Sequence, residues 1–310
     1  MNILFTGASS FTGYWFVTKL AEAGHEVRTT FTRGSAEAYG EDVRGQRVRR
    51  IAERSKPLFS CSFGSAPFLD YLKNERVDLL CHHAADVTDY KSPEFDICNA
   101  VANNTRGVQE VLKLLSRNGK TALLLTGSVF EGGEGAGSEG LPAFSPYGVS
   151  KTATADICAY FCRALGVPMG KFVIANPFGP WEDARFTGYL MRTWSKGDVA
   201  NIRTPAYIRD NIHASLLALA YVSFAESLPA TSDGFSRTNP SGYVESQGAF
   251  AGRMAQEMQL RTGWECRFEC ARQTEFDEPR IRINTDPVDG ATLGWDETVA
   301  WNELAQWYTP

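Results

Sequence analysis

The chain reads Thr6-Gly7-Ala8-Ser9-Ser10-Phe11-Thr12-Gly13 between its first apolar run, 2–6, and its first helical pattern, 14–23. Small residues at such a place let the chain turn sharply and let its backbone approach a pyrophosphate. The N-terminus of the next helix then offers unpaired N–H groups to the anion. A turn of this kind after the first strand favours a dinucleotide-binding fold over an ordinary βα turn. The predicted cofactor contacts in the turn are Gly7, Ser9, Ser10, Phe11, Thr12 and Gly13.

Apolar runs alternate with helical patterns through the first half of the chain. Further strands are expected at 26–31, 58–62, 77–82, 121–126 and 171–175, and helices at 101–116 and 146–165. This order predicts an α/β fold with a Rossmann-type doubly wound parallel sheet, covered by helices on both faces.

Beyond residue 176 the loops lengthen, with helices expected at 211–224, 245–261 and 300–308. We therefore expect a Rossmann domain over 1–175, to which about 208–226 and a strand near 235–238 return. The remainder of 176–310 is expected to form a smaller C-terminal substrate-binding lobe.

Composition and charge exclude several classes of protein. The 310 residues are 43% hydrophobic and 22% charged, with a formal net charge of −5 and no long basic block. A nucleic-acid partner is therefore not expected. A membrane partner is not expected either, because no stretch approaches the ~20 apolar residues of a membrane span. The N-terminus has no basic leader, which favours a cytoplasmic protein. Seven scattered cysteines then indicate buried, reduced thiols, and the four histidines lack metal-ligand spacing, so no metal is predicted.

The end of the second strand bears on the choice of nicotinamide cofactor. In Rossmann folds an acidic residue there binds the ribose 2′-hydroxyl and selects NAD. This chain has no acid near Phe31, and Thr32 and Arg33 follow instead. A guanidinium can hold a 2′-phosphate with two hydrogen bonds. The pattern favours NADP(H), with NAD(H) as the alternative and Arg33 then a solvated loop residue.

A tyrosine and a lysine stand four residues apart at the start of a predicted helix, in Tyr147-Gly148-Val149-Ser150-Lys151. This spacing places both side chains on one helical face. A phenol has an ordinary pKa of about 10, and a nearby ammonium favours its ionised form. Tyr147 and Lys151 are therefore candidate catalytic residues. The preceding strand ends in Thr126-Gly127-Ser128, which offers two hydroxyls to a reacting oxygen.

Together these motifs resemble the extended short-chain dehydrogenase/reductase family, whose members include nucleotide-sugar epimerases, dehydratases and ketoreductases. One departure is Ser10, which stands where that family has the middle glycine of its turn. The resemblance continues through a His-x-Ala-Ala ending at 82–85, Asn-x-x-Gly at 104–107, Asn-Pro-Phe-Gly-Pro at 176–180, Arg-Asp-x-Ile-His at 209–213 and Leu-Gly-Trp at 293–295. His82, His83 and His213 are interpreted as packing residues.

The resemblance implies roles for these residues. Tyr147 would exchange a proton with a sugar oxygen, Lys151 would assist it and hold the cofactor ribose, and Thr126 would orient the oxygen. Ser128 is the alternative hydroxyl and a predicted substrate contact. Further predicted cofactor contacts are Thr32, Arg33, Ser62, Ala84, Ala85, Asn104, Tyr147 and Lys151. Asn176 and Arg209 are predicted substrate contacts, with Arg209 on the pyrophosphate of a nucleotide-sugar.

The leading prediction is an NADPH-dependent nucleotide-sugar 4-ketoreductase. The second is a 4-epimerase that retains NAD, and the third is a non-catalytic nucleotide-binding sensor on the same fold. The 4,6-dehydratase reaction is disfavoured, because Gly127 and Ser128 occupy the places of that reaction's Asp-Glu pair. The resemblance also implies a homodimer formed through the helices predicted at 101–116 and 146–165.

Overall fold

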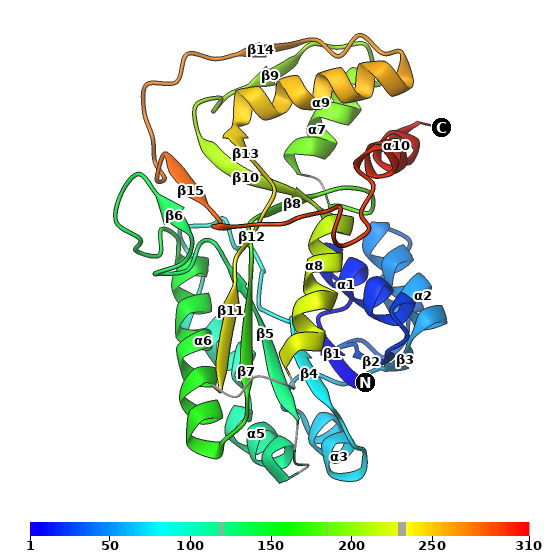
Figure 1. Ribbon diagram of the computed structural model, residues 1–310, viewed down its shortest axis with the longest axis vertical. Helices are drawn as coiled ribbons and strands as arrows, with labels where there is room; N and C mark the ends of the chain where they lie inside the picture. The colour runs from blue at the N-terminus through cyan, green and yellow to red at the C-terminus, as the bar shows by residue number, and fades with distance from the viewer. Residues whose placement is uncertain (118, 120, 184, 229–233, 310) are drawn as a thin grey trace. The chain divides into compact units, whose positions relative to one another are not determined.

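The computed structural model describes residues 1–117, 119, 121–183, 185–228 and 234–309. These residues form two compact units, shown as ribbons in Figure 1. The first unit comprises Met1–Glu134, Pro142–Ile174 and Tyr221–Thr238, and the second comprises Gly135–Leu141, Ala175–Ala220 and Asn239–Pro310. The chain thus re-enters the first unit at Tyr221, later than the predicted return at about 208.

The first unit is built on a seven-stranded parallel sheet with the order β11-β7-β5-β4-β1-β2-β3. Its strands are β1 (Asn2–Thr6), β2 (Glu26–Thr30), β3 (Lys56–Leu58), β4 (Leu79–His82), β5 (Ala122–Ser128), β7 (Met169–Ile174) and β11 (Phe235–Thr238). The predicted doubly wound α/β fold is confirmed. The strand order reverses between β1 and β4, and ligands of such sheets bind beyond the carboxyl ends of the strands at that reversal.

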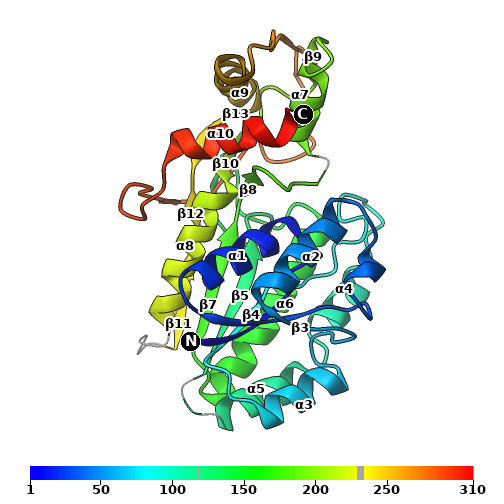
Figure 2. The same ribbon diagram turned by 90° about the vertical axis from the view of Figure 1, so that its right-hand side faces the viewer.

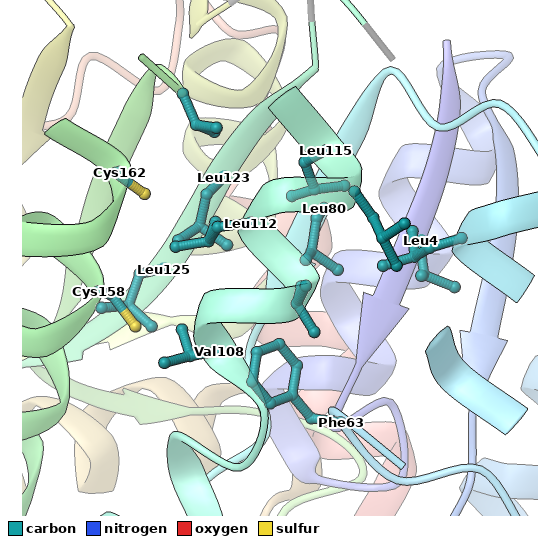
Figure 3. Close-up of a cluster of buried hydrophobic side chains, with 14 of the residues drawn as sticks. Leu4, Phe63, Leu80, Val108, Leu112, Leu115, Leu123, Leu125, Cys158 and Cys162 are labelled. Atoms are coloured by element: carbon teal, nitrogen blue, oxygen red, sulfur yellow. The ribbon is translucent and has the colours of Figure 1, made fainter. Parts of the chain in front are cut away.

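Helices cover both faces of this sheet. They are α1 (Phe11–Glu22), α2 (Val43–Arg54), α3 (Ala66–Asn74), α4 (Ile97–Asn104), α5 (Val108–Arg117), α6 (Pro146–Leu165) and the end of α8 (Ala214–Ser227) from Tyr221 onward. On one face Leu80, Leu123 and Leu125 pack with α3, α5 and α6 (Figure 3). On the other face Phe16 of α1 stacks on Tyr221 of α8 with ring centroids 4.0 Å apart. Figure 2 shows α1 and α2 side by side.

Several predicted elements needed correction. The helix expected at 101–116 is two helices, α4 and α5, because Gly107 adopts a positive φ of 61° between them. The third strand ends at Leu58 and so lies earlier than 58–62. The first residues of the helix expected at 211–224 belong instead to strand β10 (Ile208–His213), and the helix itself begins at Ala214. Helix α2 was missed because it is rich in arginine and buries few apolar side chains, chiefly Val48 and Ile51.

The second unit contains smaller sheets and three further helices. One sheet has the order β13-β10-β15-β6, with β8 also paired to β10. Its strands are β13 (Tyr243–Ser246), β10, β15 (Ile281–Ile283), β6 (Ala136–Gly137) and β8 (Asn176–Phe178); the two remaining pairs are β12 (Pro240–Ser241) with β16 (Asp286–Pro287) and β14 (Phe268–Cys270) with β9 (Ala200–Ile202). The helices are α7 (Phe186–Trp194), α9 (Gln247–Thr262) and α10 (Glu297–Tyr308). Their core includes Trp194, Phe250 and Trp301.

Candidate active site

The turn after β1 is tight, because backbone atoms crowd both of its glycines. Gly7 has a φ of 81°, and a Cβ there would lie 2.6 Å from the Ala84 nitrogen. A Cβ on Gly13 would lie 2.3 Å from the Gly7 carbonyl oxygen. The Ala84 N–H donates to the Thr6 hydroxyl at 3.0 Å, which joins the turn to the residues after β4. The turn therefore sits at the reversal of strand order, against the N-terminus of α1.

Ser10, at the middle-glycine position, caps α1 and binds His83. Its hydroxyl donates to the Gly7 carbonyl at 2.9 Å and accepts from the Gly13 N–H at 3.1 Å. The hydroxyl hydrogen is thus used, so Ser10 can only accept from His83 Nε2, 3.0 Å away. The Ser10 hydroxyl has no second hydrogen with which to bind a phosphate.

His83 joins the turn to β5. Since Nε2 carries the ring proton, Nδ1 accepts from the Thr126 hydroxyl, 2.9 Å away. The Thr12 hydroxyl also lies 3.1 Å from Nε2. Burial lowers the pKa of His83 to about 3, so the ring is neutral near pH 7. The sequence had indicated only a packing role for this histidine.

Helix α6 presents Tyr147 and Lys151 from its first turns. Its N-cap is Ser145, whose hydroxyl accepts from the Gly148 N–H at 3.1 Å. The Lys151 side chain is buried, and its ammonium donates to the Thr126 carbonyl at 2.6 Å. Tyr147 lies among aromatic rings, with its ring centroid 5.4 Å from that of Tyr90. Burial lowers the pKa of Lys151 below its usual value.

The two candidate hydroxyls at the end of β5 differ in access. The Thr126 residue is 4% exposed and its hydroxyl is bonded to His83, while only its carbonyl contacts Lys151. Ser128 is partly exposed, and its hydroxyl accepts from the Phe130 N–H at 3.2 Å. The hydroxyl hydrogen of Ser128 remains available for another acceptor in the described structure of the site.

Asn104 holds the segment that follows β4. Its side-chain oxygen accepts from the Asp86 N–H at 2.8 Å, and its carbonyl oxygen lies 2.9 Å from His82 Nε2. Burial lowers the pKa of His82 to about 4. Ala85 belongs to the segment so held. Ser62 lies after β3, where its carbonyl accepts from the Ser65 hydroxyl at 2.8 Å.

Two arginines gather beyond the end of β2. Thr32 and Arg33 are exposed, and their N–H groups donate to the Tyr39 hydroxyl at 3.1 and 3.3 Å. The guanidinium carbons of Arg33 and Arg44 lie 4.9 and 5.4 Å from the Tyr39 ring centroid. Arg44 Nη2 also donates to the Ser9 hydroxyl at 3.1 Å. Two guanidinium groups, one from the segment after β2 and one from α2, therefore lie against the same ring, and that of Arg44 also contacts the turn.

Arg44 and Arg47 were missing from the predicted site. Arg47 is 1% exposed, and its Nε donates to the Ser9 carbonyl at 3.1 Å, which ties α2 to the turn. The density of arginine over 44–54 was the available signal. Without a predicted helix there, the sequence did not show that these side chains point to the turn.

Two predicted substrate contacts belong to the second unit. Asn176 Nδ2 donates to the Asp210 carbonyl at 3.3 Å. Arg209 forms an ion pair with Glu278 at 2.9 Å and donates to the Pro279 carbonyl at 3.0 Å. Its guanidinium lies 4.4 Å from the Tyr207 ring centroid. An anion bound by Arg209 would therefore compete with the Glu278 carboxylate.

The described residues contain no group of three His, Cys, Asp or Glu side chains suited to a metal ion. Five cysteines are buried, whereas Cys98 and Cys270 are exposed, contrary to the expectation that all the thiols are buried. Over the same described residues, every helix is too short or too polar to traverse a lipid bilayer.

Comparisons with known proteins show the family and the fold of the chain. The model of the NAD dependent epimerase/dehydratase family matches residues 3–231. Among solved structures, the UDP-glucose 4-epimerase of Thermotoga maritima with UDP-glucose is 18% identical, covers 99% of this chain and 98% of its own, and has a TM-score of 0.70. The UDP-glucuronic acid 4-epimerase of Bacillus cereus with UDP-glucuronic acid and NAD is 16% identical, with 99% of each chain covered and a TM-score of 0.73. Pal from Bacillus thuringiensis is 17% identical, with 99% and 98% covered and a TM-score of 0.73. No curated protein sequence matches the chain.

Proposed function

We propose, from the premise that the chain belongs to the NAD-dependent epimerase/dehydratase family, that it is an NADPH-dependent nucleotide-sugar 4-ketoreductase. The observation that carries the choice of cofactor is the pair of guanidinium groups of Arg33 and Arg44 on the Tyr39 ring, beyond the end of β2, where the chain has no acid near Phe31. A ketoreductase consumes one reduced cofactor per turnover, so its cofactor must exchange.

The turn fits a dinucleotide pyrophosphate. Gly7 and Gly13 let the turn pack closely on itself and on Ala84, and the backbone of such a glycine turn can approach an anion closely. The N-terminus of α1 adds the positive end of the helix dipole. Arg33 and Arg44 would bind a 2′-phosphate through charge-assisted hydrogen bonds. For Arg44, this phosphate would take the place of the Ser9 hydroxyl as partner.

Tyr147 is the proposed acid that protonates the keto oxygen. Lys151 is the proposed cation that favours the ionised form of the phenol, so that Tyr147 releases its proton more readily. A bound nicotinamide would supply the hydride for the sugar carbon. Ser128 is the more accessible of the two hydroxyls, so we assign it the hydrogen bond to the reacting oxygen. Thr126, predicted for that role, instead holds Lys151 through its carbonyl and His83 through its hydroxyl.

A 4-epimerase is the second candidate, favoured by the likeness to two solved UDP-sugar 4-epimerases. An epimerase returns the hydride to the sugar and regenerates its cofactor, so it gains from holding NAD tightly. The same Tyr147 and Lys151 would serve both reactions. The two candidates therefore differ in cofactor exchange more than in catalytic residues.

The purified protein itself can separate the two candidates. We expect it to carry little bound NAD and to oxidise NADPH in proportion to added 4-keto nucleotide-sugar, as seen by loss of absorbance near ~340 nm, the reduced nicotinamide band. The Tyr147→Phe variant should still bind NADPH but turn over about 10²–10⁴-fold more slowly.

Protein that is isolated with NAD and interconverts two 4-epimeric nucleotide-sugars without added cofactor would establish the epimerase instead. Cofactor binding with no turnover of either substrate class would contradict both reactions and support a nucleotide sensor. Wild-type rates for Tyr147→Phe would remove this tyrosine from the mechanism.

A further inference from the structure

A buried ionic cluster lies next to the proposed catalytic lysine and has no part in the mechanism described above. Lys171 of β7 contacts Glu131 at 2.5 Å and Glu134 at 2.8 Å. The side chains of the two glutamates are 0% and 4% exposed, and that of Lys171 is 9% exposed. Arg237 of β11 lies 3.6 Å from Glu134 and is half exposed. Charged groups are rarely buried to this extent unless they are paired.

This cluster and Lys151 hold three consecutive residues at the end of β5. The Lys151 ammonium binds the Thr126 carbonyl at 2.6 Å. The next residue, Gly127, has no side chain, and a Cβ there would lie 2.8 Å from Lys171 Cε and 3.2 Å from Glu131 Oε1. The third residue, Ser128, donates its N–H to Glu131 at 2.7 Å. The absence of a side chain at position 127 thus leaves the space that the end of the Lys171 side chain occupies.

On the basis of the function proposed above, we propose that Glu131 is a positioning residue of the active site. Its buried carboxylate fixes the Ser128 end of β5 and balances the ammonium charge of Lys151, while Lys171 holds the carboxylate in place.

The charges of the neighbouring groups support this assignment. Burial lowers the pKa of Lys151, and the Glu131 carboxylate raises it. The Lys171 ammonium lowers this pKa and Cys158 raises it, both by less than Glu131 does. Burial alone would lower the pKa of Lys171, but the two carboxylates raise it by more than burial lowers it. The pKa of Lys171 is therefore above its usual value, and the side chain stays charged. Glu134 pairs with the same Lys171, but the carboxylate that accepts the Ser128 N–H and that raises the pKa of Lys151 most is that of Glu131.

The test compares Glu131→Gln with Glu134→Gln, which removes the same charge from the same lysine. Glutamine at 131 keeps an oxygen for the Ser128 N–H but loses the charge, so Lys151 should lose its proton at lower pH. We expect the alkaline limb of kcat/KM to move down by on the order of one pH unit, a tenfold change in proton affinity. Glu134→Gln should leave this limb in place. In Glu131→Gln/Lys171→Met the neighbouring positive charge is also removed, so the limb should return toward the wild-type position.

A second readout needs no substrate. The absorbance of the Tyr147 phenolate, taken as the difference between each protein and its Tyr147→Phe counterpart, should titrate at higher pH in Glu131→Gln than in wild type. Equal effects of the two single variants, an unmoved alkaline limb, or further loss in the double variant would overturn the assignment. If no protein turns over any nucleotide-sugar, the proposed function fails, and the phenolate titration still decides the role of Glu131.

Discussion

At the scale of single residues, the proposed preference for NADPH depends on the side chains that surround Ser9. Ser9 meets Arg44 through its hydroxyl and Arg47 through its carbonyl, so one residue of the turn contacts two guanidinium groups. The exposed group, Arg44, is free to change partner, whereas Arg47 is buried and fixed by its contact with the turn. This division predicts different outcomes for arginines that stand three residues apart.

Arg33→Ala and Arg44→Ala should each weaken NADPH binding by about 1.5–3 kcal/mol, the range for a hydrogen bond to a charged group. NADH binding should change little, because the lost partner is the 2′-phosphate. Arg49→Ala is the matched control, since Arg49 pairs with Glu41 instead of the turn. Dissociation constants of both cofactors from fluorescence titration decide the matter, and an equal loss for NADPH and NADH would refute the assignment.

At the scale of elements, the site depends on how β4 meets the turn and β5. His83 follows β4 and bonds to Ser10, ahead of α1, and to Thr126, inside β5. Because the ring is neutral and each nitrogen has a fixed role, the turn and the β5 strand are held by one side chain. The glycine-to-serine change at position 10 therefore adds a link between elements.

His83→Leu removes this link, because it replaces the imidazole with an apolar side chain of similar bulk. It should cost about 1–3 kcal/mol of unfolding free energy, because the buried Thr126 hydroxyl loses its acceptor. Thr126→Val should relieve part of this cost, giving a non-zero coupling in the double-mutant cycle. Urea unfolding of the four proteins measures the coupling. Strictly additive losses would show that the two side chains do not act together.

Over the whole molecule, the buried His82 and His213 and the partly buried His83 should make stability sensitive to acid. Burial lowers the pKa of His82 to about 4 and that of His83 and His213 to about 3. Below pH ~6.5 the unfolded chain takes up protons that these folded side chains do not, so stability falls as pH falls. Burial raises the pKa of Glu182 and Asp210, and these two carboxyl groups act in the opposite direction.

The free energy of unfolding should therefore decrease between pH 6.5 and 5.5, by about 1 kcal/mol for each of these histidines. The variant His213→Gln should have a shallower dependence by nearly one proton. Denaturant unfolding at a series of pH values provides the slopes. If the variant and wild type share one slope, His213 is not held neutral in the folded protein.

The sequence by itself determined the parts of this protein that depend on local pattern. Strand β1 and helix α6 have the predicted bounds, since one is a continuous apolar run and the other begins at a Ser-Pro pair and ends before a glycine. The turn and the Tyr147–Lys151 spacing were also evident, because each is a short motif with its own chemistry.

Only the tertiary structure decided which distant groups meet. The sequence separations are 73 residues for Ser10 and His83, and 35 for Ser9 and Arg44. The Glu134–Lys171 contact spans 37 residues. Local propensity carries no information about such pairs, since they come together only when the parallel strands align and their helices pack. The arginine-rich α2 and the glutamates after β5 have the polar composition of solvent-exposed segments. Only the folded structure shows that Arg47, Glu131 and Glu134 are buried and contact the candidate site.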